Sequence, residues 1–397
     1  MKIKLGIFFG GKSVEHEIAV ITANQAYASI DKEKYEIIPI YISKNGILYT
    51  GENLFNLEEY KDMDALLNKC TKVTLINDGE NVKVIRYPIK KFGENIINTI
   101  EVAFPIMHGT NGEDGTIQGY LQLLGLPYIG CDIVSSAIGM DKIIMKKVLQ
   151  ENGLPIVKYI SFDSMEYIKK EEDIQKNIEE KLGFPVIVKP GNLGSSVGIK
   201  KAKNIQELGE AIDFAIQFSD RILVEEAVVN LREINCSVIG DFTDCKPSVC
   251  EEPISTDEIL SYADKYIGGG KAKGSANGQK GMQSSQKKLP AELSDEKRKE
   301  IETLAMETFK VLGASGVSRI DFLMDKNTEK VYVNEINTIP GALSYYLWEA
   351  SGKSFKEEIN ELVDLALKRQ RNKEKTTFSY DQNILALNGK KLGNKAK

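Results

Sequence analysis

Short apolar runs and amphipathic stretches alternate from the start of the chain. The runs Ile3–Phe9 and Tyr35–Ile42 have the length of buried strands, and the apolar positions within Val14–Ile21 recur at helical spacing. Gly10-Gly11 turns the chain after the first run, and Ser13 is predicted to be the N-cap of the helix. Strands that alternate with helices indicate an α/β fold, with a parallel sheet in this part of the chain.

The same patterns predict elements further along the chain. A strand is expected from Val102, followed by a glycine-rich loop and a helix, and a change of pattern near Ile129-Gly130 predicts a domain boundary. The other predicted elements are a helix over Asp141–Leu149, strands at Phe184–Lys189 and Ile222–Glu226, and a long polar loop over Tyr262–Leu289. A loop of that length inside a compact domain is typical of a functional or disordered segment.

A predicted β-hairpin in the C-terminal third carries the most informative polar residues. Two apolar runs, Ile320–Met324 and Val331–Ile336, flank the polar turn Asp325–Lys330. A turn centred on this segment places Asp321 almost opposite Glu335, and like charges that face each other destabilise a sheet. Burying each ion costs several kcal/mol, against roughly 0.2–1 kcal/mol for a favourable cross-strand pair. The hairpin therefore predicts a bound Mg²⁺, unless its polar face is solvated and the acids are ordinary surface charges.

Strict alternation assigns the side chains of this hairpin to faces. Successive side chains of a strand point to opposite faces of the sheet. One face is then expected to carry Arg319, Asp321 and Leu323, and another Val331, Val333, Glu335 and Asn337.

Composition and charge narrow the class of protein. The 397 residues allow two or three domains, and 42% hydrophobic and 27% charged residues are typical of a soluble globular protein. The net charge of -5 argues against a nucleic-acid binder, no apolar stretch approaches the roughly 20 residues that span a membrane, and no secretory signal pattern is present. The five cysteines show no CxxC spacing and are expected to be reduced thiols in a cytosolic protein: Cys70, Cys131, Cys236, Cys245 and Cys250.

Two lysines lie at positions suited to phosphate binding. Lys189 ends a predicted strand and is followed by the glycine-rich segment Pro190–Ile199, whose backbone amides can approach an anion closely. This segment does not match GxxxxGK[ST], and a flexible surface hairpin is the competing interpretation. Lys142 opens a predicted helix, where the helix dipole favours anions, so a lysine is out of place there unless a phosphate is near. An exposed lysine in a first helical turn is the competing interpretation.

The two histidines and two acids near the N-terminus are weaker signals. His16 and His108 follow predicted strands, where open α/β sheets carry their ligand crevice, although a lone histidine is more often structural. Glu15 and Glu17 lie in the first turn of the first predicted helix, where the dipole favours acids without any ligand. Gly10-Gly11 does not match the GxGxxG fingerprint, so NAD is not indicated.

A series of motifs adds a resemblance to a known family. In order, the motifs are Gly10–Glu17, His108–Gly119, Met140–Lys142, Val188–Gly198, Arg232-Glu233, Lys265-Tyr266, Arg319–Asp321 and Asn334–Gly341. Together they resemble the D-alanine–D-alanine ligases of the ATP-grasp superfamily, over a span from about Lys2 to about Leu367. The ordered series is far more specific than any single motif.

The resemblance implies an α/β protein with the three-domain ATP-grasp fold. The expected parts are an N-terminal Rossmann-like α/β (pre-ATP-grasp) domain at 1–130, a central ATP-grasp subdomain at 131–224, a C-terminal subdomain at 225–372 and an extra basic tail at 373–397. ATP is expected between the central and C-terminal subdomains, with two Mg²⁺ ions, or Mn²⁺ in their place. The resemblance further implies a cytoplasmic homodimer that takes D-alanine as substrate, with no nucleic-acid or membrane partner.

The resemblance also implies a role for each matched residue. The ATP site would comprise Lys142 and Lys189 on the phosphates, Glu225 and Glu226 at the adenine, and Glu233 on the ribose. The metal ligands would be Asp321, Glu335 and Asn337. The catalytic set would comprise Glu15 on the ammonium of the first D-alanine, supported by Ser195 and Tyr266, with Arg319 and Gly341 on the oxyanion. Substrate binding would further involve His108, Ser344 and Tyr346.

The implied reaction joins two D-alanines through an acyl phosphate, for peptidoglycan precursor synthesis. The match departs from the family after Gly341, because Leu343 replaces a hydroxyl residue and Tyr346 stands where a carboxylate-binding Ser is expected. Two alternatives therefore stay open: a ligase that joins D-alanine to another acceptor such as D-serine, and a non-catalytic nucleotide-binding relative. Tyr266 favours the D-alanine-adding type over relatives that add D-lactate.

Overall fold

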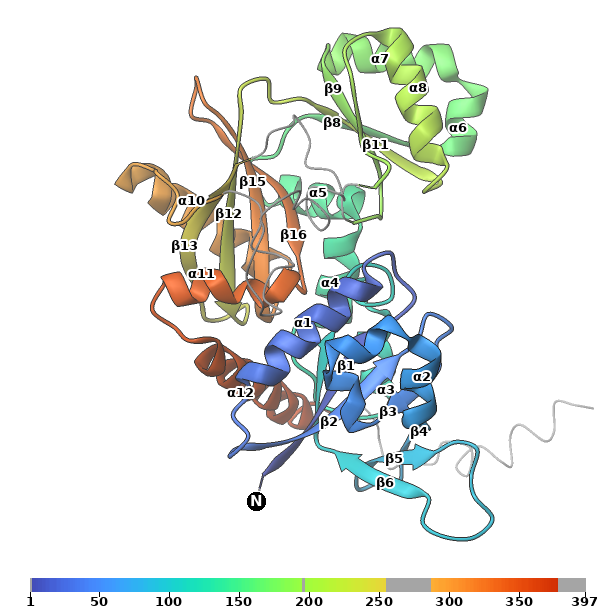
Figure 1. Ribbon diagram of the computed structural model, residues 1–397. Helices are drawn as coiled ribbons and strands as arrows, with labels where there is room; N and C mark the ends of the chain where they lie inside the picture. Colours follow the sequence, from blue (N-terminus) through green and yellow to red (C-terminus); the bar gives the residue numbers. More distant parts are fainter. Residues whose placement is uncertain (1, 195–196, 255–286, 378–397) are drawn as a thin grey trace, which may run out of the picture.

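The computed structural model describes residues 2–194, 197–254 and 287–377, and the strands in these ranges form three sheets (Figure 1). The N-terminal sheet has the order β6-β5-β4-β3-β2-β1-β7, in which β1 pairs in parallel with β2 and β7 and the other neighbours are antiparallel. Its strands are β1 (Ile3–Gly10), β2 (Tyr35–Ile42), β3 (Leu48–Thr50), β4 (Thr71–Asn77), β5 (Val82–Arg86), β6 (Ile96–Ile100) and β7 (Val102–Ile106). The helices of this part are α1 (His16–Ser29), η1 (Glu52–Phe55), η2 (Leu57–Lys61), α2 (Met63–Lys69) and α3 (Thr116–Leu123).

The first helix begins later than the sequence predicts. Helix α1 starts at His16, and Glu15 occupies its N-cap position without a side-chain cap hydrogen bond. The hydroxyl of Ser13 instead accepts a hydrogen bond from the backbone N–H of Glu15 at 3.1 Å, so the prediction of Ser13 as the N-cap is wrong. Gly10 and Gly11 both have positive φ, and the extra turn that they make carries the chain past Ser13 before the helix starts.

The central sheet is small and antiparallel, with the order β10-β9-β11-β8. Its strands are β8 (Tyr159–Asp163), β9 (Val186–Pro190), β10 (Lys200–Ala202) and β11 (Arg221–Glu226), and its helices are α6 (Ser164–Lys169), α7 (Glu171–Leu182) and α8 (Ile205–Ile216). Two helices, α4 (Ile133–Met140) and α5 (Lys142–Glu151), lie between it and the N-terminal part (Figure 1). The predicted strands ending at Lys189 and Glu226 and the predicted helix over Asp141–Leu149 are thus confirmed, with Asp141 as the N-cap of α5.

The C-terminal sheet is antiparallel and forms the floor of the site described below. Its order is β14-β13-β12-β15-β16, with strands β12 (Leu231–Gly240), β13 (Cys245–Pro253), β14 (Lys287-Lys288), β15 (Gly316–Asp325) and β16 (Val331–Asn337). Helix α10 (Asp295–Val311) covers one face and shares a core with side chains such as Ile320, Phe322 and Val333. After η3 (Gly341–Ser344) and α11 (Tyr345–Ala350), helix α12 (Phe355–Glu374) returns to pack on the N-terminal sheet.

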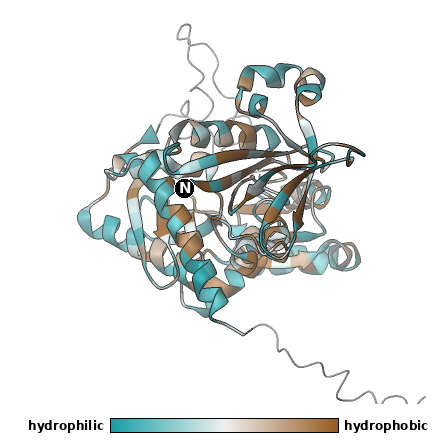
Figure 2. Ribbon diagram, turned by 90° about the horizontal axis from the view of Figure 1, so that it is seen from below, coloured by the Kyte–Doolittle hydropathy of each residue, from teal (hydrophilic) through white to brown (hydrophobic). Residues whose placement is uncertain are grey.

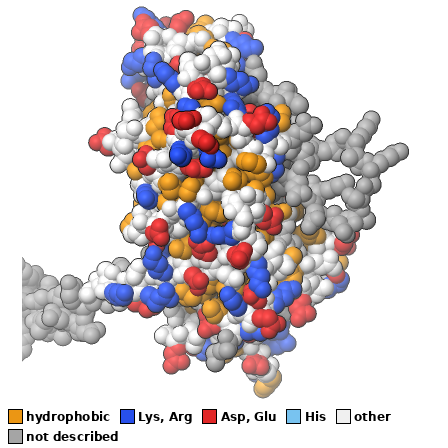
Figure 3. Space-filling view, turned by 90° about the vertical axis from the view of Figure 1, so that its left-hand side faces the viewer, with side chains coloured by type: hydrophobic (Ala, Val, Ile, Leu, Met, Phe, Trp, Pro, Cys, Tyr) orange, Lys and Arg blue, Asp and Glu red, His pale blue; other side chains and the backbone are white. Residues whose placement is uncertain are grey.

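Hydropathy and charge vary over short distances in the described part of the molecule (Figure 2, Figure 3). Figure 2 shows largely apolar strands among helices that carry hydrophilic stretches. In Figure 3, acidic and basic side chains are interspersed over the described part of the visible face. Among the described residues, no helix combines the length and apolarity needed to cross a membrane.

One acid is buried inside the packing of α12. Glu358 is fully buried, and neither of its carboxylate oxygens has a hydrogen-bond partner among the described residues. Burial raises the pKa of Glu358 well above its usual value, although Lys353 opposes the shift. The folded protein therefore favours the protonated acid at a pH where the unfolded chain is ionised.

We expect Glu358→Leu to raise the free energy of unfolding by about 1–3 kcal/mol at pH 8. A carboxyl with a raised pKa contributes stability that is fully present below its unfolded pKa of 4.5 and is lost as the pH rises toward the folded value. The gain from leucine should therefore shrink below pH 4.5, and urea unfolding across this range measures it. Glu374→Leu, at the exposed end of the same helix, is the control, and an equal pH profile for both variants would contradict the prediction.

Candidate functional site

A cavity of about 650 Å³ is lined by residues of the central and C-terminal sheets, of helices α4 and α5, and of loops of the N-terminal part. The predicted site residues that line it are Glu15, His108, Lys142, Lys189, Glu225, Glu226, Glu233, Arg319, Asp321, Glu335, Asn337, Gly341 and Tyr346. Ser195 and Tyr266 lie outside the described residues. Ser344 is fully buried and is not among the residues that line the cavity, so its hydroxyl is not presented to a ligand there.

The predicted hairpin is β15 and β16, and its register places Asp321 opposite Glu335, as expected. A bulge interrupts the pairing directly after this position, because Phe322 pairs with Val333 and Asn334 is left over. Val331 and Val333 consequently face the core under α10, whereas Glu335 and Asn337 line the cavity. The prediction that these four side chains share a face is therefore wrong.

Each carboxylate of the opposed pair is neutralised by a cation. Arg319 donates two hydrogen bonds to Asp321, from Nε at 2.6 Å and from a terminal nitrogen at 2.8 Å. Asn337 Nδ2 donates to the same carboxylate at 3.0 Å, and Lys142 Nζ lies 2.8 Å from Glu335. Burial alone would lower the pKa of Lys142, but Glu335 outweighs it and raises the pKa above the usual value. The repulsion expected from the sequence is thus offset within the protein.

The opposed pair belongs to a longer row of polar residues across the C-terminal sheet. Glu251 of β13 is the register partner of Asn235 of β12, which in turn faces Asp321 of β15 and then Glu335 of β16. All four line the cavity. Asn235 Nδ2 donates to Glu251 at 3.1 Å. The row thus includes a third carboxylate, Glu251, which is buried and which sequence reasoning missed.

Lys189 belongs to a buried group of three charges. Its Nζ lies 2.5 Å from one oxygen of Glu225, and Lys146 Nζ lies 2.6 Å from the other. Lys189 also donates to Asn334 Oδ1 at 3.1 Å, which joins the central strand β9 to β16. Burial would raise the pKa of Glu225, but Lys146 and Lys189 outweigh it and lower the pKa to about 2.

This group of charges bears on the predicted role of Glu225 at the adenine of ATP. Because both carboxylate oxygens of Glu225 are held by lysines, its side chain is committed to these lysines in this structure. Apolar side chains that line the cavity nearby, Ile187 of β9 and Phe322 and Ile336 of the C-terminal sheet, offer a surface for a flat base instead. Lys146 was missed from the sequence, although it lies four residues after Lys142 and therefore on the same helical face.

The two histidines lie in different environments. His16 does not line the cavity and hydrogen-bonds to the carbonyl of Gly11 at 2.7 Å and the hydroxyl of Tyr41 at 3.0 Å. His108 lines the cavity, and its Nδ1 donates to the carbonyl of Ile339 at 2.8 Å. His16 is therefore a structural residue, and His108 is attached to the chain segment that leads to Gly341.

Further hydrogen bonds clamp this segment against the N-terminal part. The N–H of Ile339 donates to Glu113 at 3.0 Å, and the hydroxyl of Thr22 is 3.0 Å from His108 Nε2 and 3.4 Å from the N–H of Ala342. Burial, and then the charge of Glu15, raise the pKa of Glu113 to about 8. Glu113 lies within the motif His108–Gly119, whereas no sequence motif indicates a role for Thr22.

The segment after Gly341 adopts an unusual backbone. Ala342, Leu343 and Ser344 all have φ between 49° and 57°, the left-handed region that non-glycine residues rarely enter. The turn directs Tyr346 into the cavity, where its hydroxyl donates to Glu251 at 2.7 Å. Burial and the nearby Glu251 raise the pKa of Tyr346 well above its usual value, so the phenol stays neutral.

The residues present also fit a hard divalent cation. Asp321 and Glu335 offer carboxylate oxygens on one face of the hairpin, and Asn337 adds an amide whose oxygen and nitrogen can exchange places by a flip. Among the described residues, no group of three or more His, Cys, Asp or Glu side chains assembles for a metal. A cation here would therefore rely on two carboxylates and one amide, with phosphate and water as further ligands.

Comparison with known proteins identifies the family. Family models described as "D-ala D-ala ligase N-terminus" and "D-ala D-ala ligase C-terminus" match residues 4–131 and 148–364. The D-alanine–D-alanine ligase of Thermosipho melanesiensis is 41% identical over 97% of this chain and 99% of its own. The chain belongs to the D-alanine–D-alanine ligase family. Its resemblance to this family, inferred from ordered motifs, is confirmed.

Solved structures of the family share the fold of this ligase. The D-alanine–D-alanine ligase from Coxiella burnetii has a TM-score of 0.78 and 28% identity, with 99% of each chain covered. The VanG D-Ala:D-Ser ligase from Enterococcus faecalis has a TM-score of 0.75 and 30% identity, covering 92% of this chain and 100% of its own. A D-alanine–D-alanine ligase from Bacillus anthracis complexed with ATP has a TM-score of 0.65 and 25% identity, covering 94% and 99%. The predicted ATP-grasp fold is thereby confirmed.

Proposed function

We propose that this ligase joins two molecules of D-alanine at the expense of ATP, for the synthesis of peptidoglycan precursors. The observation that carries the proposal is one cavity in which helix α5, the central sheet and the C-terminal sheet bring together the two lysines, the opposed acids and Arg319. An ATP-dependent ligase needs such a group of charged side chains, because phosphoryl transfer depends mainly on positioning and charge stabilisation.

The first step activates the carboxylate of the first D-alanine. A carboxylate oxygen attacks the γ-phosphorus of ATP, the bond between that phosphorus and the bridging oxygen breaks, and ADP leaves with the electron pair. We assign Lys142 and Lys189 to the phosphates, Glu233 to the ribose and the backbone near Glu226 to the adenine, all of which line the cavity. Glu15 is assigned to the substrate ammonium, together with Ser195 and Tyr266.

The second step forms the peptide bond. The neutral amine of the second amino acid attacks the carbonyl carbon of the acyl phosphate, the nitrogen loses a proton, and the C–O bond to phosphate breaks. We assign the oxyanion of the tetrahedral intermediate to Arg319 and the backbone N–H of Gly341. The hydrogen bond that His108 donates to this segment and those that Glu113 and Thr22 accept from it support this role, because they hold the segment that carries Gly341.

We assign two Mg²⁺ ions to Asp321, Glu335 and Asn337, with Mn²⁺ as a substitute. Bound there with the nucleotide, the metal would supply positive charge to the transferring phosphate. Arg319 and Lys142, which neutralise these acids in the structure, would then be available to phosphate oxygens.

The proposal extends to organisation and location. We divide the chain at 1–130, 131–224, 225–372 and 373–397. The three sheets support this division, although β11 of the central sheet runs two residues past the second boundary, to Glu226. Residues 378–397 of the tail lie outside the described residues. A cytoplasmic homodimer without nucleic-acid or membrane partners remains our expectation. The use of ATP and the mixed surface charge in Figure 3 support the cytoplasm and the absence of nucleic acid.

A different acceptor is the main alternative. The similarity to the VanG D-Ala:D-Ser ligase and the departure at Leu343 and Tyr346 favour testing D-serine. A non-catalytic role is less well supported, because every charged residue assigned to the two steps among the described residues lines one cavity.

The test is product analysis with ATP and Mg²⁺. D-alanine alone should yield D-alanyl-D-alanine and one phosphate for each dipeptide, as measured by mass spectrometry and a phosphate assay. Parallel reactions add D-serine or D-lactate. If phosphate and product appear only when another acceptor is added, the D-alanine–D-alanine assignment fails, and if no phosphate appears with any acceptor, the catalytic assignment fails.

A further inference from the structure

The acceptor amino acid brings a carboxylate into a cavity that is rich in acids. A buried carboxylate needs a cation or several hydrogen-bond donors, and an unpaired one is costly. Tyr346 has already committed its hydroxyl to Glu251, and Ser344 does not line the cavity. The group that receives the acceptor carboxylate must therefore be found elsewhere in the cavity.

Four cations that line the cavity in the described part of the chain are in direct contact with an acid. Lys142 contacts Glu335 at 2.8 Å, Lys189 contacts Glu225 at 2.5 Å, Arg232 contacts Glu252 at 2.7 Å, and Arg319 contacts Asp321 at 2.6 Å. Lys287 differs from these four, because its Nζ is 3.6 Å from Glu251, beyond a normal hydrogen-bond distance. An ammonium has three donors, so Lys287 keeps capacity for a second anion.

Lys287 also lies beside the segment that should choose the acceptor. Its Nζ stands 3.3 Å from the centre of the Tyr346 ring, and both residues line the cavity. The charge of Arg319 acts on both Lys287 and Tyr346, which places the three groups in one neighbourhood. Arg319 is the residue assigned to the oxyanion, and the acceptor amine must attack next to it.

The surrounding contacts hold this lysine in place. Glu251 is anchored by Asn235 at 3.1 Å and by the hydroxyl of Tyr346 at 2.7 Å, so it is a fixed neighbour for Lys287. The aromatic ring supplies a second attraction, worth about 0.5–2 kcal/mol for a cation–π contact. Burial lowers the pKa of Lys287, with Glu251 opposing the shift, and an incoming carboxylate would relieve part of that cost.

We propose that Lys287, seated over the ring of Tyr346, binds the carboxylate of the acceptor amino acid and thereby selects acceptors that carry one. This inference rests on the proposed ligase function, whose second substrate it concerns. Tyr346 then serves as the platform for the lysine, rather than as the direct carboxylate ligand.

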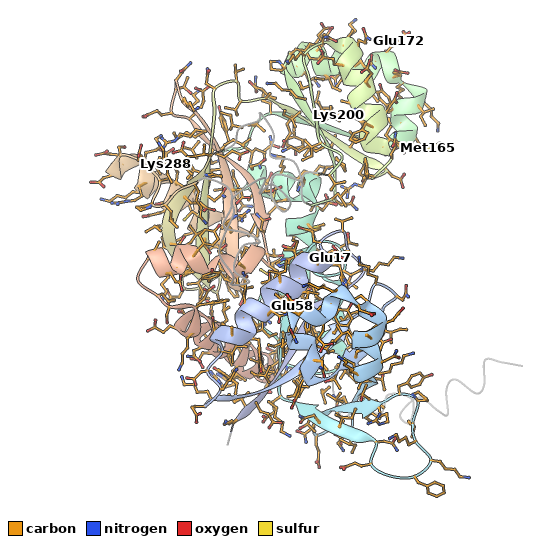
Figure 4. All side chains as sticks on the ribbon, viewed as in Figure 1. Glu17, Glu58, Met165, Glu172, Lys200 and Lys288 are labelled. Carbon is orange, nitrogen blue, oxygen red and sulfur yellow. The ribbon has the colours of Figure 1, made fainter. Side chains whose placement is uncertain are left out.

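The neighbouring lysine provides a matched control. Lys287 and Lys288 are consecutive residues of β14, so their side chains point to opposite faces of the sheet. Lys288 does not line the cavity and pairs with Glu292 at 2.9 Å (Lys288 is labelled in Figure 4). A substitution there changes the same charge in the same strand without touching the proposed subsite.

The test is a competition between two acceptors in one reaction. D-alanine and D-alaninamide, which lacks the carboxylate charge, are supplied together with ATP and Mg²⁺, and the two dipeptide products are quantified by mass spectrometry. Lys287→Gln should lower the preference for the charged acceptor by about 10- to 100-fold, the range for one charged hydrogen bond. It should raise the KM of the second D-alanine while leaving the KM of ATP unchanged.

Two further variants and the wild type distinguish loss of the Lys287 charge from a packing defect and from failure of the proposed function. Lys287→Arg should retain most of the preference, which a general packing defect would not explain, and Lys288→Gln should match the wild type. An unchanged preference in Lys287→Gln overturns the inference, and so does an equal loss in Lys288→Gln. If the wild type itself forms no dipeptide, the proposed function fails instead.

Discussion

Glu335→Gln is expected to lower kcat by about 100- to 1,000-fold, the scale observed when one preorganised charge-stabilising group is removed. The substitution removes a proposed metal ligand and leaves Lys142 without the carboxylate that it contacts at 2.8 Å. The Mg²⁺ concentration for half-maximal rate should rise by about 10- to 100-fold. Steady-state rates at a series of Mg²⁺ concentrations measure both effects.

The control for this variant lies on the same hairpin. Glu329 is exposed in the turn between β15 and β16, outside the cavity, and Glu329→Gln removes one charge without removing a ligand. Its Mg²⁺ dependence should match that of the wild type. Normal turnover in Glu335→Gln would contradict the metal role of the hairpin.

Glu225→Gln is expected to destabilise the protein by about 3–5 kcal/mol near neutral pH. The substitution leaves Lys146 and Lys189 buried beside each other without a counter-charge, since both now contact the same carboxylate. ATP binding should weaken as well, because Lys189 loses the group that holds it toward Asn334. Urea unfolding with and without ATP measures the two effects.

The stabilisation that Glu225 contributes should decrease as the pH falls. The folded pKa of Glu225 is about 2, against an ordinary value of 4.5, so its stabilisation is present above pH 4.5 and is lost as the pH falls toward 2. The wild type should therefore approach Glu225→Gln in stability over this range.

A second substitution separates charge from packing. Lys146→Met combined with Glu225→Gln leaves one lysine instead of two and should recover part of the lost stability at pH 7. Equal stability of the single and double variants would show that repulsion between the lysines is not the cause.

The sequence predicts the elements of this protein better than their junctions. Strands β1, β2, β9 and β11 and helix α5 arise from local apolar patterns, and each occurs within two residues of its predicted limits. The start of α1 was misplaced because two glycines with positive φ add a turn that apolar spacing does not reveal. The faces of β16 were misassigned because one bulged residue reverses the alternation.

The site was predictable where residues come from one hairpin or one motif. The pairing of Asp321 with Glu335 follows from the turn alone. The cations that neutralise these acids, and the acid Glu251, come from other strands and helices, and their proximity depends on how the sheets pack. Thr22 acts through a contact with a residue far away in the sequence, for which no local pattern exists. Lys146 shares a helical face with Lys142, but its partner Glu225 is equally remote in the sequence.

The polar row across the C-terminal sheet limits where the protein can tolerate insertions and deletions. The row consists of register partners on four neighbouring strands: Glu251, Asn235, Asp321 and Glu335. Deleting one residue from a strand, ahead of its residue in the row, would shift the register by one and turn that side chain toward α10. Insertions and deletions should consequently be tolerated at the turn Asp325–Lys330 and purged from the strands themselves. Single-codon deletion scanning of β12 and β15 would display this difference as a sharp boundary between tolerant turns and intolerant strands.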